Sequence, residues 1–134
     1  MIRNLGVWAA MFVAAALFNF AIGFPLMLAR HWAFALAFVS ADAENAGIAP
    51  DLWADFGYCV VLIGVGYLIV ARDVTRNRGL VWLGIFAKLF DVVVLSWRTV
   101  IGMTRPIVLL PAGIDAVFVL LFVWFLLAVP KTDR

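Results

Sequence analysis

Four long stretches of the chain are apolar at nearly every position, and they cover residues 5–28, 52–71, 80–102 and 107–129. A helix needs about 20 mainly apolar residues to cross a bilayer. Because the apolar residues occupy all faces of each helix, the pattern differs from the one-sided stripe of a helix in a soluble protein. The pattern predicts an all-α integral membrane bundle of four helices with short loops, forming a single domain over residues 1–134.

The connection between the first two stretches is the longest one. Its front half, residues 32–39, is strongly apolar but too short to span a bilayer. We therefore expect this segment to lie in the membrane interface or to fold back onto the bundle. Its rear half, Ser40 to Pro50, is polar and is expected to form a turn. The first stretch is too long for a signal peptide and lacks a convincing cleavage site, so we expect it to be a retained helix.

Composition points to the same class of protein. Hydrophobic residues make up 67% of the chain and charged residues 13%, and the mean hydropathy is +1.13. A soluble domain of this size cannot bury so much apolar surface. The net charge is only +2, and the arginines lie in short loops and tails, which argues against nucleic acid as a partner.

The sequence offers little for conventional catalysis or for a cofactor. Cys59 is the only cysteine and therefore cannot form an intramolecular disulfide, and His31 is the only histidine. The motifs of nucleotide-binding, zinc-protease and serine-hydrolase sites are absent from the sequence. The residues thus predict no metal and leave the identity of any cofactor unknown, and they favour a protein that is not an enzyme.

Basic residues are distributed unequally between the two sides of the predicted bundle. An even number of spans puts both termini on one side, and that side carries six basic residues: Arg3, Arg72, Arg76, Arg78, Lys131 and Arg134. The other side carries three: Arg30, Arg98 and Arg105. Loops rich in Lys and Arg stay in the cytoplasm. We therefore expect a multi-pass protein of the cell inner (plasma) membrane with both termini cytoplasmic.

Lys88 and Asp91 interrupt the third apolar stretch near its middle. A charge in hydrocarbon is costly, so it is usually neutralised, paired or turned toward a protein interior. The two residues are three apart, share a helix face and can pair directly. Depth counting at about 1.5 Å per residue brings Asn19, Tyr58 and Asp115 to a similar level. These five residues are expected to form an interior polar layer, either as a ligand site or as a purely structural ion pair with its neighbours.

Several of these polar residues have a structural alternative. Asp115 would fall in the first turn of its helix if that helix began at Pro111, where the helix dipole favours a carboxylate. Asn19 would serve as a hydrogen-bonding contact to a neighbouring helix. Asp55 and Arg98 lie nearer the outer boundary and are candidates for a second ion pair.

Three parts of the sequence resemble the DoxX-like group of small four-helix bacterial membrane proteins. They are residues 17–26, residues 66–73 continuing through 76–84 to 88–89, and residues 113–118. The resemblance implies a four-helix bundle and a lipophilic ligand. Some relatives are subunits of quinone-linked oxidation systems, and others assist redox-enzyme maturation. It supplies no catalytic residues, and the single cysteine departs from a dithiol role.

These features favour a membrane protein that binds a quinone- or lipid-like small molecule, or that serves as an accessory subunit of a membrane complex. In the binding version, Lys88 contacts the polar group of the ligand, while Asp91 and Asp115 hold Lys88 in place. The alternative is a proton-coupled transporter that acts as an oligomer. An intramembrane enzyme for a lipid or sterol substrate is the third hypothesis, because a Lys–Asp pair can serve acid–base chemistry. Expected partners are the lipid bilayer, a lipophilic ligand, and further copies of the chain or a larger complex.

Overall fold

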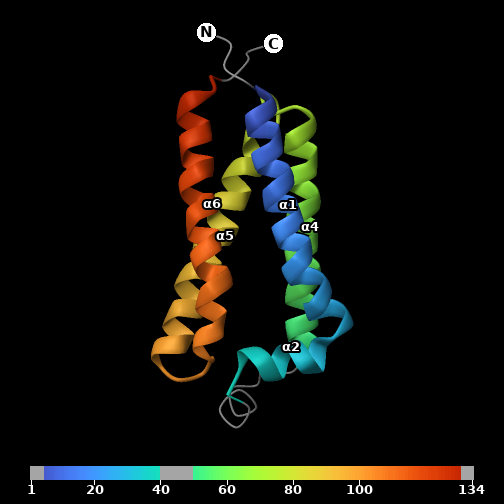
Figure 1. Cartoon of the computed structure of the whole chain (residues 1–134), viewed down its shortest axis with the longest axis vertical. Coiled ribbons are helices and arrows are strands. Elements are labelled where there is room, and N and C mark those ends of the chain that lie inside the picture. The colour runs from blue at the N-terminus through green and yellow to red at the C-terminus, as the bar shows by residue number, and fades with distance from the viewer. Residues whose placement is uncertain (1–4, 40–49, 131–134) are drawn as a thin grey trace.

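The computed structural model describes residues 5–39 and 50–130, and within them the chain is helical (Figure 1). The elements are α1 (Leu5–Leu28), α2 (Arg30–Ala37), α4 (Pro50–Arg72), α5 (Arg78–Val100), the short 3-10 helix η1 (Pro106–Val108) and α6 (Leu109–Ala128). Four of the described helices are long and apolar enough to cross a membrane, which confirms the predicted all-α bundle. The protein is therefore a small integral membrane protein.

Some predictions fall outside the described residues. Arg3, Lys131 and Arg134 are among them, and so is nearly all of the turn predicted between Ser40 and Pro50. The chain after α5 turns at Gly102, whose φ of 79° lies in the left-handed region that residues with a Cβ adopt only at a cost. This turn lets the chain reverse within a few residues and enter η1 and α6.

The four spanning helices form two antiparallel pairs, α1 with α4 and α5 with α6 (Figure 1). Glycines allow the backbones of α1 and α4 to approach closely. A Cβ added to Gly23 would lie 2.9 Å from the carbonyl oxygen of Gly57, and a Cβ added to Gly57 would lie 3.0 Å from that of Gly23. Small residues at such crossings are typical of helix pairs in membranes, where close van der Waals packing drives association.

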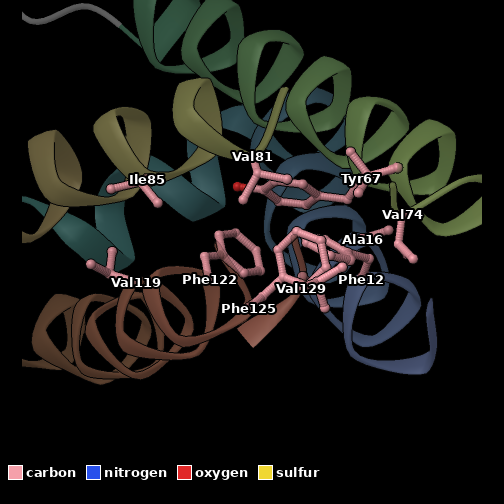
Figure 2. Close-up of a cluster of buried hydrophobic side chains, with 12 residues drawn as sticks. Phe12, Ala16, Tyr67, Val74, Val81, Ile85, Val119, Phe122, Phe125 and Val129 are labelled. Carbon is pink, nitrogen blue, oxygen red and sulfur yellow. The ribbon is translucent and has the colours of Figure 1, made fainter. Parts of the chain in front are cut away.

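An aromatic core joins the two pairs at the end of the bundle where the described chain starts and finishes (Figures 1 and 2). The ring of Phe12 stacks on Phe122 with centroids 5.0 Å apart and meets Phe125 edge-on at 5.1 Å. The ring of Tyr67 meets Phe122 at 5.1 Å. All four side chains are fully or almost fully buried, so this aromatic core closes that end of the bundle.

At the opposite end, α2 folds back across the bundle (Figure 1). Its buried face belongs to a second apolar cluster, made of Leu26, Ala33, Phe34, Ala37, Phe38, Trp53 and Val108. The carbonyl of Ala37 accepts a hydrogen bond from the backbone N–H of Arg105 at 2.8 Å, and the N–H of Val39 donates to the carbonyl of Met103 at 3.2 Å. The segment that follows α2 is thereby tied to the loop after α5. Residues 32–39 therefore pack against the bundle, and their position relative to the membrane interface stays a prediction.

Candidate functional site

Lys88 lies near the middle of α5, and its ammonium group is bonded by two other helices. Nζ donates to Oδ1 of Asn19 on α1 at 3.0 Å and to the carboxylate of Asp115 on α6. The amide of Asn19 donates in turn to the carbonyl of Val60 on α4 at 3.0 Å. Lys88 is 3% exposed and Asp115 7%. One hydrogen-bonded cluster thus links all four spanning helices.

Three aromatic rings surround the same ammonium group. The ring centroids of Phe18 and Phe118 are each 5.3 Å from Nζ, and that of Tyr67 is 5.6 Å away. Aromatic faces attract cations at such distances, and more strongly where water is excluded. The ammonium of Lys88 is therefore neutralised and enclosed by groups of the protein itself.

The predicted direct pairing of Lys88 with Asp91 is wrong. Among the described residues, the ion pair of Lys88 is with Asp115, and Asp91 has no ion pair or side-chain hydrogen bond. Residues three apart on a helix can pair, but the ammonium of Lys88 is directed instead to the carboxylate of Asp115 on α6 and to the amide oxygen of Asn19 on α1. The alternative role of Asp115 as a first-turn residue does not apply either, because α6 begins at Leu109, more than one turn before Asp115.

A cavity of about 420 Å³ extends from this cluster toward α2 and η1. Its volume falls within the range of roughly 300–1,000 Å³ that is common for small-molecule sites. The charged and amide side chains on its wall are Asn19, Lys88, Asp91 and Asp115. Most of the remaining wall is apolar, and it includes five aromatic rings: Phe18, Trp32, Trp53, Phe56 and Phe90.

Two further predictions about polar residues are not met. Tyr58 is 54% exposed and does not line the cavity, because it lies about 100° around α4 from Gly57, which faces α1. Asp55 and Arg98 form no ion pair with each other or with any other described residue. Asp55 is exposed, whereas Arg98 lines a second cavity of about 240 Å³ between α4 and α5.

Among the aromatic residues of the site that sequence reasoning missed, Tyr67 and Trp53 are buried. Tyr67 is 1% exposed, and Gly84 makes room for it, since a Cβ there would lie 2.7 Å from the tyrosine hydroxyl. Trp53 is buried and its ring lines the cavity. Within the described chain, neither the Tyr67 hydroxyl nor the Trp53 indole N–H has a hydrogen-bond partner. The spacing of Tyr67 from Gly64, three residues along α4, was a usable signal, because such positions share a helix face.

Comparisons with protein-family models, with curated proteins and with solved structures gave no match to this chain. The resemblance to DoxX-like proteins accordingly stays a prediction. In the described part of the chain, no group of three or more His, Cys, Asp or Glu side chains is placed to hold a metal ion. The case for a function therefore rests on the cavity and its lining.

Proposed function

We propose that this membrane protein binds a lipophilic small molecule in the cavity between its two helix pairs. The observation that carries the proposal is the composition of the cavity wall, where a few charged and amide side chains interrupt a lining that is otherwise largely aromatic and aliphatic. A ligand with one polar group and a ring-containing apolar body matches this lining. Quinone- and lipid-like molecules are built in this way, and so are lipophilic amines.

The bilayer is the natural source of such a ligand. Several residues on the cavity wall are both apolar and exposed, among them Trp32, Phe90 and Leu110. The aromatic core around Phe12 and Phe122 closes the other end of the bundle, so a transport pathway would require that core to open. We therefore favour binding over proton-coupled transport. A binding role also suits a subunit of a larger membrane complex, and DoxX-like membership is part of this proposal.

The proposal is tested by filling the cavity. Ile63 lines it, whereas its neighbour Leu62 is 68% exposed and does not. A tryptophan at position 63 occupies ligand space, and a tryptophan at position 62 adds the same volume on the outer face of α4. The protein is reconstituted in nanodiscs with a photoactivatable alkylbenzophenone, and the labelled peptides are mapped by mass spectrometry.

We expect wild type and Leu62→Trp to be labelled at cavity-lining positions, and Ile63→Trp to lose most of that labelling. Labelling confined to exposed positions of the wild type, or unchanged in Ile63→Trp, would contradict ligand binding in this cavity. Thermal unfolding of both variants serves as the control for folding, because extra volume inside a packed bundle costs about 1–3 kcal/mol.

A further inference from the structure

The charges around the cavity do not cancel. Lys88 and Asp115 neutralise each other, whereas Asp91, one turn further along α5, has no ion pair or hydrogen bond within the described residues. Arg98 is two turns further along the same helix, about 10 Å along its axis. It lines the second cavity but not the first. One carboxylate on the wall of the main cavity is thus left without a counter-charge from residues 5–39 and 50–130.

The surroundings of Asp91 are suited to a cation. Asp91 lines both cavities, and the other residues common to the two are Trp53, Phe56, Phe90 and Leu95. The rings of Trp53 and Phe56 stack with centroids 5.1 Å apart. Three aromatic rings therefore share the wall with the carboxylate. Aromatic faces attract ammonium groups, and an ionised carboxylate in an apolar environment carries a desolvation cost that a neighbouring cation offsets.

Lys88 is poorly placed to bind the polar group of a ligand. Its ammonium already donates to Asn19 and Asp115, and three rings surround it. An anionic or carbonyl group of a ligand would have to compete with Asp115 for that ammonium, and an anion would also meet the negative charge of Asp91. Among the described residues, the charged group of the cavity that still lacks a partner is the carboxylate of Asp91, and its partner would be a cation.

We infer that the ligand is a lipophilic cation, a protonated or quaternary amine attached to an apolar, ring-containing body. The inference rests on the proposed function and names the ligand by its charge. The ammonium group pairs with the carboxylate of Asp91 among the rings of Trp53, Phe56 and Phe90. The apolar body extends from there along the aliphatic wall toward α2.

Three probes of matched shape test the sign of the charge. They are phenylbutyltrimethylammonium, the uncharged compound in which carbon replaces its nitrogen, and phenylbutanesulfonate. Each is titrated calorimetrically into the protein in nanodiscs of zwitterionic lipid, with empty nanodiscs subtracted. We expect the cation to bind at least about tenfold more tightly than the uncharged compound, and the anion to bind most weakly.

Asp91→Asn keeps the shape of the side chain and removes its charge, so it should abolish the preference for the cation. Asp55→Asn is the matched control, because Asp55 is exposed on a spanning helix and lines neither cavity. This control variant should retain the full preference. Circular dichroism checks that both variants keep the wild-type helix content.

The outcomes separate this inference from the proposed function. Equal binding of the three probes, or a cation preference that survives in Asp91→Asn, overturns the inference while leaving ligand binding intact. Binding of none of the probes, with cavity labelling by the benzophenone retained, also overturns it. Failure of the cavity-labelling experiment itself overturns the proposed function.

Discussion

At the scale of single residues, the pair formed by Lys88 and Asp115 carries the largest expected effect on stability. Both groups are buried, and each is the counter-charge of the other. Removing one partner of a buried ion pair leaves an uncompensated charge and costs about 3–5 kcal/mol. We expect Lys88→Met to lower the free energy of unfolding by this amount, measured by denaturant titration in mixed micelles.

A second variant separates the lost pair from the lost side chain. Replacing both groups in Lys88→Met/Asp115→Leu removes the unpaired charge, and buried ion pairs can often be exchanged for apolar residues at little cost. The double variant should therefore be more stable than Lys88→Met alone. If the single variant were as stable as wild type, Lys88 could not be buried and paired as described.

The depth of these polar residues could be predicted from sequence, but their direction could not. Counting the rise per residue placed Asn19 and Lys88 near mid-depth and Asp115 in the outer half of its helix, and the structure brings the three into hydrogen-bonding contact. The same counting selected Tyr58, which faces outward, and missed Tyr67, whose ring lies over Lys88. Rise along a helix gives height alone, whereas the direction of a side chain depends on which neighbouring helix packs against it.

At the scale of elements, Arg78 at the start of α5 caps the end of α6. Its guanidinium donates to the carbonyl of Leu126 at 2.6 Å and to that of Val129. The last carbonyls of a helix lack partners within the helix, and a cation near them is favourable. Since hydrogen bonds to charged groups contribute about 1.5–3 kcal/mol, Arg78→Ala should lower the free energy of unfolding by roughly that amount.

Arg76→Ala is the matched control for this cap. The guanidinium of Arg76 is exposed, and its ion pair with Asp73 is 3.5 Å long, so its removal should cost less than about 1 kcal/mol. Equal losses in the two variants would contradict capping by Arg78. Thermal unfolding of both variants in the same micelles makes the comparison.

The positions of the four spans could be predicted from hydropathy, whereas the pairing of the helices could not. A span is identified by the mean hydropathy of about 20 residues, so the four spans were found although the predicted ends differ from the observed ones by a few residues. Pairing is different, because helices that are apolar on all faces have no stripe to show which side meets a neighbour. The close crossing of α1 and α4 depends instead on Gly23 and Gly57, where the lack of a side chain lets the backbones meet.

At the scale of the whole molecule, the two ends of the bundle differ in charge and in packing. Among the described residues, Arg72, Arg76 and Arg78 lie at the end closed by the aromatic core, and Arg30, Arg98 and Arg105 lie at the end covered by α2. The six-to-three excess of basic residues counted from the sequence on the side of the termini predicts that the first end faces the cytoplasm. The cavity, which extends toward α2, would then lie in the outer half of the membrane and receive its ligand from the outer leaflet.

This orientation is measurable with single cysteines in a Cys59→Ser background. Gly79→Cys lies at the core end, where an added Cβ meets no other atom within 4 Å, and Ile101→Cys lies at the α2 end, where Ile101 is 47% exposed. A membrane-impermeant maleimide should label Ile101→Cys on intact cells, and Gly79→Cys only after permeabilisation. The reverse pattern would put the α2 end in the cytoplasm, and the ligand would then have to come from the inner leaflet.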